Sequence, residues 1–360
     1  YIWGAQITTS AKTLPYVKSL DTRPIKTFAE TLRTEYDAVT GKNLGALIEG
    51  GITNTMITSE EISAWAVYNQ GSLQTLNITD NYGLAPDNTM SASRLVGSLN
   101  DATSNSRLIV RRITPTGSTI TLSFWVKSLT GNYSASFHFK GAPLGTVAMT
   151  SEWKRVSFSG VTGSSSENLG IDIVGHLVSS LDFDFLMWGA QVEDLPFATS
   201  YIRTEGAAVS RSADGLSIGA ENISEVQDNY TIASNVSIIG FNNGTQRLFN
   251  VEGETLRSFQ PATGAPTFLP VLRLNNTGNR PAGTQMASGV TTQFVLRKEN
   301  ITQSLFQGGV IFSESILTNA IGDKTSISIG KKGAAEYLFG HISKFATYAQ
   351  ALTAQEITLL

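Results

Sequence analysis

Apolar and polar residues alternate with a period of two through the middle of the chain. The segment STITLSFWVKSL (118–129) places Ile120, Leu122, Phe124 and Val126 on one face. This period is typical of a half-buried β-strand, because successive side chains of a strand point to opposite faces. Similar segments, bounded by Gly, Ser or Asn, lie at 132–141, 152–161, 169–175 and 181–192. Short strands with no long helical pattern between them predict an antiparallel β-sandwich.

A second β-rich stretch begins near residue 223. Its clearest strand patterns lie at 229–241, 245–253, 269–276, 291–300, 325–330 and 336–349. The segment RTEGAAVSRSADG (203–215) between the two stretches is small and polar, which is typical of a linker. We therefore predict an all-β chain of tandem antiparallel β-sandwiches with minor short helices.

Two helix-start signals stand among these strands. Near the end of the sequence, Thr353 and Glu356 form a T-x-x-E capping box before a short apolar run, which predicts a brief terminal helix. Thr58 and Glu61 give a similar start signal ahead of Trp65.

The tetrapeptide WGAQ occurs twice, at 3–6 and at 188–191, and without any gap Tyr16 then falls on Tyr201. In the second copy this strand closes the first predicted sandwich. We therefore interpret residues 1–18 as the last strand of an earlier homologous module. The alternative is a free-standing strand, which would leave its backbone donors and acceptors unpaired and expose a sheet edge.

The resulting division has five parts, and 360 residues suffice for two or three domains of about 150 residues each. Residues 1–20 are the terminal strand of the upstream module, and 21–50 form a connector. Residues 51–205 form the first β-sandwich, 206–222 a linker, and 223–360 the second β-sandwich.

Composition narrows the function classes. Charged residues make up 15% of the chain and the formal net charge is −3, so no basic stripe for nucleic acid is present. No apolar run reaches the roughly 18 residues of a membrane-spanning helix, so no membrane insertion is predicted. The sequence has no cysteine, which excludes disulfides and thiolate chemistry. Stability must come from apolar cores.

The titratable residues do not form a recognisable catalytic pattern. His138, His176 and His341 lie in separate strand-like contexts without metal-type spacing. Asp182 and Asp184 do fall on one strand face, where paired acids serve glycosidases or bind Ca²⁺. A solvated polar face opposite the neighbouring phenylalanines is the favoured interpretation. We therefore predict no enzymatic activity, no metal and no cofactor.

Aromatic side chains are the remaining candidates, because sugar-binding sandwiches place such rings against pyranose faces. The candidate sugar contacts are Trp65, Tyr68, Trp125, Tyr133 and His138. Trp125 points away from the apolar alternation of its strand, which is compatible with an exposed ring. For each candidate, packing in the protein interior is the favoured alternative, and it is also the role expected of Trp153 and Trp188.

Several ordered motifs carry a family resemblance. Residues 32–65 contain YDAVTG, GALIE, TN, SE and a closing Trp65, and LAPDNTMSASRLV follows at 84–96. FWVKS (124–128), EWKRVSFS (152–159) and the segment 187–214 complete the series. This order resembles tailed-phage virion proteins that carry a jelly roll similar to carbohydrate-binding modules. The family's Ala-Pro-Asp-Gly segment has Asn88 here in place of its glycine.

The end of the chain carries a second, shorter resemblance. FGHISKFATYAQALTAQEITLL (339–360) is similar to the ending of laminin-G and concanavalin A-like domains. Neither resemblance includes catalytic residues. Together they cover nearly the whole chain and imply a virion part or a glycan binder.

The resemblance implies a bacteriophage virion structural protein, a fibre or adhesin component on the particle surface. Its expected partners are other virion proteins and a host-surface polysaccharide, and a homotrimer is expected. Three alternatives stay open. In the first, the chain is the non-catalytic glycan-binding part of a polysaccharide-degrading enzyme such as a tailspike depolymerase. In the second, it is a secreted bacterial adhesin. In the third, it is a purely architectural protein without a ligand.

Overall fold

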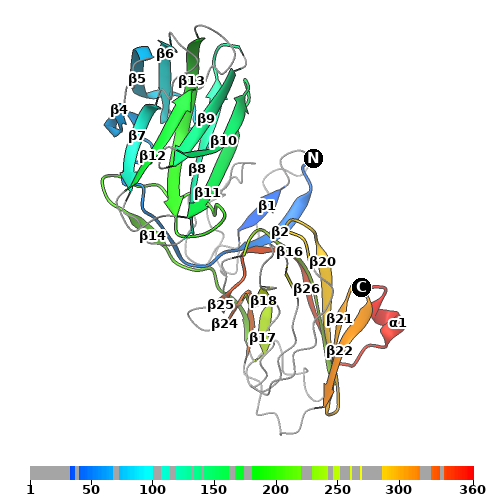
Figure 1. The fold of residues 1–360 in the computed structure, drawn as a ribbon. Coiled ribbons are helices and arrows are strands. Elements are labelled where there is room, and N and C mark those ends of the chain that lie inside the picture. The colour runs from blue at the N-terminus through cyan, green and yellow to red at the C-terminus, as the bar shows by residue number, and fades with distance from the viewer. Residues whose placement is uncertain are drawn as a thin grey trace. The chain divides into compact units, whose positions relative to one another are not determined.

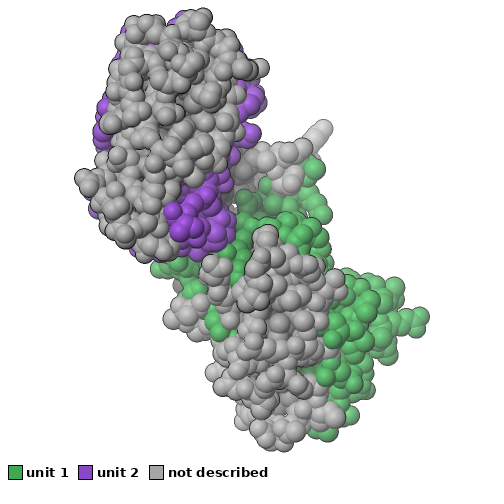
Figure 2. Space-filling view, in the orientation of Figure 1, with its two compact units in different colours: residues 1–16, 28–51, 212–360 green, residues 17–27, 52–211 purple. Residues whose placement is uncertain are grey.

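The computed structural model describes most of the chain from residue 33 onward. The described ranges are 33–36, 40–67, 73–99, 107–113, 119–131, 133–139, 142–161, 167–173, 181–219, 229–241, 246–251, 260–261, 268–269, 286–316, 326–332 and 336–360. The predicted terminal strand at 1–20 lies outside them. The described residues form two compact units (Figure 2). Residues 33–51 and 212–360 belong to unit 1, and residues 52–211 to unit 2.

Unit 2 contains two antiparallel five-stranded sheets (Figure 1). The first has the order β10 (Ala142–Met149), β9 (Tyr133–Phe139), β12 (Glu167–Ile173), β7 (Arg107–Ile113), β4 (Ala66–Val67). The second has the order β11 (Lys154–Val161), β8 (Thr119–Ser128), β13 (Leu181–Glu193), β6 (Ala92–Leu99), β5 (Leu73–Gly83). The strand patterns at 118–129, 132–141, 152–161, 169–175 and 181–192 are all confirmed.

The core of unit 2 lies against the second sheet and follows the period-two pattern. Phe124 and Val126 of β8 and Phe183 and Phe185 of β13 are buried in one cluster with Val156 of β11. Burying each such side chain contributes about 1.5–3 kcal/mol. The opposite side chains of the same strands therefore form a separate face, called here the outer face of unit 2.

Unit 1 is built around a seven-stranded antiparallel sheet. Its order is β1 (Thr34–Tyr36), β2 (Asn43–Ile48), β26 (Gly340–Tyr348), β16 (Tyr230–Ile238), β20 (Thr292–Glu299), β21 (Thr302–Gln307), β22 (Val310–Ile316). A three-stranded sheet contributes to the same core, in the order β15 (Leu216–Gly219), β23 (Ser326–Ile329), β17 (Phe249–Val251). Two short pairs complete the unit: β18 (Gln260–Pro261) with β19 (Phe268–Leu269), and β24 (Lys331–Lys332) with β25 (Glu336–Tyr337).

The terminal helix covers part of the large sheet of unit 1. Helix α1 (Ala354–Ile357) packs Ile357 against Val295 and Phe306. Its predicted capping box is confirmed. The Thr353 hydroxyl accepts a hydrogen bond from the Glu356 amide, and the Glu356 carboxylate accepts one from the Thr353 amide at 2.7 Å. A cap of this kind stabilises a helix by about 1 kcal/mol.

The second helix-start signal is wrong in its capping. A single 3₁₀ turn, Ile62–Ala64, does precede Trp65. However, Glu61 stands at its N-cap position and makes no side-chain cap hydrogen bond. Thr58 instead forms an isolated β-bridge with Glu205, which removes it from the helix start.

Unit 2 is inserted within the sequence of unit 1. The segment predicted as a connector, 21–50, contains β1 and β2, which are strands of the large sheet of unit 1. The segment predicted as a linker, 206–222, contains β15 and β14 (Val209–Arg211). Strand β14 pairs with β3 (Ile52–Asn54), so the two ends of the segment 52–211 lie side by side. Adjacent termini of this kind permit domain insertion.

An ion cluster of unit 1 marks the points where the chain leaves and re-enters that unit. The Asp214 amide donates to the Glu49 carbonyl at 2.9 Å, and the Glu49 amide donates to Asp214 Oδ2 at 2.8 Å. Arg33 donates to Glu49 Oε2 at 2.7 Å and also to Asp214. Burial lowers the pKa of Arg33, but the two carboxylates outweigh it and raise that pKa overall.

The all-β class with antiparallel β-sandwiches is confirmed, although the second sandwich takes strands from both sides of the first. Within the described ranges, no helix is both apolar and long enough to cross a membrane.

Candidate functional site

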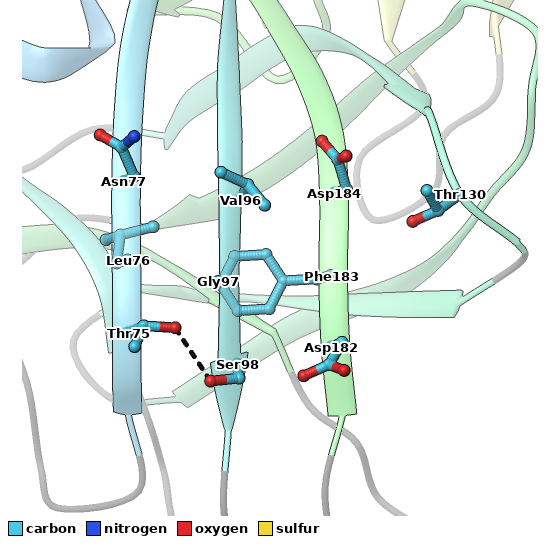
Figure 3. A pocket seen from close by; sticks show the side chains of 10 residues that line it. All are labelled: Thr75, Leu76, Asn77, Val96, Gly97, Ser98, Thr130, Asp182, Phe183 and Asp184. Atoms are coloured by element: carbon cyan, nitrogen blue, oxygen red, sulfur yellow. Dashed lines mark hydrogen bonds between the residues drawn. The ribbon is translucent and has the colours of Figure 1, made fainter.

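A shallow, open groove of about 560 Å³ lies on the outer face of unit 2 (Figure 3). It exists because β13 alternates: Phe183 and Phe185 enter the core, so Asp182 and Asp184 point the other way. Strands β5, β6 and β13 and the segment after β8 supply its polar lining: Thr75, Asn77, Ser98, Thr130, Asp182 and Asp184.

Cross-strand register brings these side chains together. Two rows cross the three strands: Thr75–Ser98–Asp182 and Asn77–Val96–Asp184. In the first row the Thr75 and Ser98 hydroxyls are hydrogen-bonded at 2.9 Å. Between the rows lies Gly97, where a Cβ would stand 2.1 Å from the Thr75 carbonyl oxygen and 2.6 Å from the Phe183 ring. Glycine at this position therefore allows β5 and β6 to approach closely beneath the groove.

Arg94 fixes one end of the groove. Its Nε and Nη2 donate to the two carboxylate oxygens of Asp184 at 2.8 and 2.6 Å. The hydrogen bond with Asp184 raises the pKa of Arg94. The third nitrogen, Nη1, donates to the Tyr82 hydroxyl at 3.0 Å, and the guanidinium lies 4.7 Å from the centre of the Tyr82 ring. Asp184 and Tyr82 are thereby held in place by one planar group.

Two features of the site remain open to solvent. The Tyr82 residue is 44% exposed although Arg94 lies over its ring. Asp182 is also exposed, and no ion pair or hydrogen-bond partner of its carboxylate lies among the described residues. The site therefore combines an accessible ring, one compensated carboxylate and one free carboxylate, with hydroxyl and amide groups between them.

The neighbouring part of the outer face is closed by aromatic packing. Trp125 and Trp188 lie 5.1 Å apart between ring centres, and the Tyr201 ring lies within 5.7 Å of the first and 4.6 Å of the second. Trp125 does point to the outer face, but it is 0% exposed, so this candidate sugar contact is wrong and the favoured alternative, packing in the interior, holds. The physical reason is that Tyr201 and the Arg155 guanidinium, 4.5 Å from the ring centre, cover it.

The other candidate sugar contacts do not gather at the groove. Trp65 is buried in the main core and donates its ring N–H to the Thr58 carbonyl at 3.3 Å, so it offers no ring face to a ligand and this candidate is wrong. Tyr68 lies outside the described residues. Tyr133 and His138 lie on β9, where the structure describes the backbone but not these side chains.

The second WGAQ copy has a structural role. Gly189 has a φ of 67° at a bulge of β13, and a Cβ there would stand 2.9 Å from the Trp125 ring. The side chain of Gln191 donates to the Ser200 carbonyl at 3.2 Å and accepts from the Ile202 amide at 2.6 Å. The motif therefore ties the segment that carries Tyr201 over the closed part of the outer face. The packing expected of Trp188 is confirmed, since it is 0% exposed.

Two acids of unit 2 have raised pKa values and do not line the groove. Burial raises the pKa of Glu193, whose carboxylate accepts from the Thr199 amide at 3.0 Å and from its hydroxyl. Burial also raises the pKa of Glu60, which accepts from the Tyr201 hydroxyl at 3.0 Å. Among the described residues, no group of three His, Asp or Glu side chains could hold a metal ion.

Asp182 and Asp184 were predicted from their strand pattern to share one polar face, whereas Asn77, Tyr82 and Arg94 were not predicted. A signal for Asn77 was present, because Thr75, Asn77 and Thr79 alternate with Leu76 and Ile78 in LQTLNITDNYG (73–83). Tyr82 lies at a register shift of β5, and no alternation of polar residues marks Arg94 in ASRLVGSL (92–99). Alternation assigns a face to each residue. It does not say which strands are neighbours.

No family model matches the chain, and no curated protein matches it. Solved structures similar to parts of it include a heptameric SAP-like pentraxin from Limulus polyphemus, with 12% identity and a TM-score of 0.30 over 36% of this chain and 68% of that chain. Domain 4 of the arabinanase AbnA from Geobacillus stearothermophilus, in complex with arabinotriose, is another. It has 15% identity and a TM-score of 0.27 over 36% of this chain and 65% of that chain.

A third is the carbohydrate-binding module CBM40 of the Ruminococcus gnavus IT-sialidase, bound to α2,3-sialyllactose. It gives 18% identity and a TM-score of 0.28 over 41% of this chain and 95% of that chain. The matched domains are β-sandwiches, the architecture that strand pairing gives for both units. Nothing in these comparisons points to a virion protein, so that resemblance stays a prediction.

Proposed function

We propose that this chain is a non-catalytic glycan-binding protein whose unit 2 contacts the glycan through the groove and Tyr82. The observation that carries the proposal is the juxtaposition of an exposed aromatic ring with fixed polar groups. A tyrosine ring matches the apolar face of a pyranose, while carboxylate, amide and hydroxyl groups match its hydroxyls. In this site Arg94 connects the two kinds of group, because it contacts both Tyr82 and Asp184.

The arrangement favours binding because its parts are already ordered. The bidentate pair with Arg94 fixes the Asp184 carboxylate, and the hydrogen bond between Thr75 and Ser98 orients two hydroxyls. Groups that are fixed before binding lose less conformational entropy when the ligand arrives. An open groove covers only part of a sugar chain, so we expect one site to bind weakly. Several copies on one particle would raise the effective concentration of the sites.

We further propose that the chain is a surface component of a tailed-phage virion, a fibre or adhesin that assembles as a homotrimer with other virion proteins. The ordered motifs at 32–65 and 187–214 support this placement. Electron microscopy of particles labelled with an antibody against the chain tests it. Label at tails or fibres is the expected result, and a chain absent from purified particles would contradict it.

Glycan-array binding by the full chain tests the sugar site. Truncating Tyr82→Ala should lower binding about tenfold, because losing an aromatic contact of about 1–1.5 kcal/mol has that effect. The control is Val161→Ala, which removes an exposed apolar side chain of β11 outside the groove lining. The control should bind normally. Failure to bind any glycan, or unchanged binding by the Tyr82 variant, would overturn the proposal.

A further inference from the structure

We propose that the groove selects neutral glycans and disfavours glycans that carry carboxylates. This inference deepens the proposed glycan-binding function and rests on it. It depends on which charges of the groove are compensated and which are free, because a free negative charge decides whether a neutral or an acidic sugar binds better.

The lining of the groove carries two charged side chains, both negative. The charge of Asp184 is compensated, because Arg94 holds both of its carboxylate oxygens. Asp182 is exposed and has no partner among the described residues. The groove therefore presents one net negative charge to a ligand, and it presents that charge at the row that also holds Thr75 and Ser98.

Three described cations of the same face do not offer an alternative anion site. Arg155 lies over the Trp125 ring in the closed part of the face and does not line the groove. Arg94 directs all three of its nitrogens to Asp184 and Tyr82. Lys127 lies on the neighbouring strand β8, opposite Leu186, and does not line the groove. A sugar carboxylate in the groove would have to displace Asp184 from Arg94 in order to gain an arginine contact, and breaking such a bidentate pair is unfavourable.

Sugar hydroxyls have the opposite preference. A hydroxyl donates a hydrogen bond to a free carboxylate such as that of Asp182, and a charged acceptor forms the stronger kind of hydrogen bond. A ligand carboxylate in place of that sugar hydroxyl cannot donate a hydrogen bond to Asp182. Like charges about 4 Å apart in water also repel by an energy equivalent to about a fivefold loss of affinity.

The experiment compares matched ligands on the full chain. Trisaccharides of galactose, glucose and mannose are each measured beside the uronic acid counterpart, in which every C6 hydroxymethyl group is a carboxylate. We expect the acidic partner of the best-binding pair to bind about fivefold to tenfold more weakly at low salt. The difference should shrink at about 1 M salt, where the Debye length falls to about 3 Å.

Two variants separate this inference from a general charge effect. Asp182→Asn keeps the size of the side chain and removes the charge, so neutral and acidic partners should then bind within about twofold of each other. Glu152→Gln removes one exposed charge of unit 2 outside the groove lining and should leave the preference intact. Equal or tighter binding of the acidic partner by the unaltered chain would overturn the inference. So would a preference that survives Asp182→Asn. Absence of binding by every neutral and acidic sugar would instead overturn the proposed function itself.

Discussion

Units 1 and 2 differ in how they keep charged groups inside a β-sandwich. Unit 1 buries arginines and gives each a carboxylate: Arg33 contacts Glu49 and Asp214, and Arg247 contacts Glu336. Unit 2 buries Glu193 beside the amide and hydroxyl of Thr199, and it buries Glu60 between the Tyr201 hydroxyl and Arg203, an arginine that is largely exposed. Arginine stays charged at every pH at which the protein is folded, whereas a carboxyl group can take up a proton. The two units should therefore respond differently to a lost partner and to pH.

The largest expected effect comes from removing a partner in unit 1. Arg247 is 0% exposed, so Glu336→Ala removes the Glu336 carboxylate from a buried guanidinium and should lower the free energy of unfolding by about 3 kcal/mol. The matched control is Glu299→Ala, which removes the same kind of partner from the exposed pair with Arg297 and should cost about 0.5 kcal/mol.

Urea unfolding followed by circular dichroism measures both variants. The described tryptophans, Trp65, Trp125, Trp153 and Trp188, all lie in unit 2, so tryptophan fluorescence reports mainly on that unit. We expect the circular dichroism transition of the Glu336 variant to shift while the fluorescence transition stays in place. Equal effects of the two substitutions would show that burial does not decide the strength of the pair.

A smaller effect should come from the bulge in unit 2. Gly189→Ala combines a positive φ with a clash against the Trp125 ring, and we expect a loss of about 2 kcal/mol. Gly206→Ala, also in unit 2, has a φ of 81° but nothing within 4 Å of the added methyl group. It should lose about 1 kcal/mol through backbone strain alone. Tryptophan fluorescence during urea unfolding compares them, and equal losses would remove the steric role assigned to Gly189.

The smallest effect concerns pH. The pKa values of Glu60 and Glu193 are raised above the ordinary 4.5, so folded unit 2 binds more protons than the unfolded chain above that pH. Their contribution to stability is full below the ordinary pKa and is lost as pH rises through the raised values. Fluorescence-detected melting of unit 2 should therefore fall in temperature as pH increases from about 4.5.

Glu193→Gln tests the source of this dependence. The variant keeps an acceptor for Thr199 but cannot ionise, so the melting temperature of unit 2 should depend less on pH. A melting temperature that rises with pH in the unaltered protein, or an unchanged slope in the variant, would contradict the assignment.

Strands were predictable from the sequence because each carries its own alternation. The pattern at 118–129 needs no knowledge of the rest of the chain, and β8 (Thr119–Ser128) appears where it was expected. The capping box at Thr353 was predictable for the same reason, since its two members are three residues apart.

Features that depend on distant residues were not predictable in this way. Strand β2 pairs with β26, so that Ala46 faces Ile342, and no local pattern in 43–48 encodes that partner. The same limit applied to Trp125. Its face was correctly inferred, but the cover comes from Tyr201, and only the folded chain brings the two rings together. Only part of the groove was predicted. Asp182 and Asp184 share a strand, so their common face follows from local alternation, whereas Tyr82 and Arg94 come from other strands and reach the site through strand pairing.

The adjacency of Glu49 and Asp214 has a mechanical consequence. The backbone of unit 1 is bridged there by two hydrogen bonds and by Arg33, just before the chain enters the inserted unit and just after it returns. A pulling force applied to the two ends of the chain would be carried by this bridge. Residues 52–211 would not bear that force until the bridge broke. Unit 2, which carries the groove, would therefore bear no force and would stay folded while the bridge held.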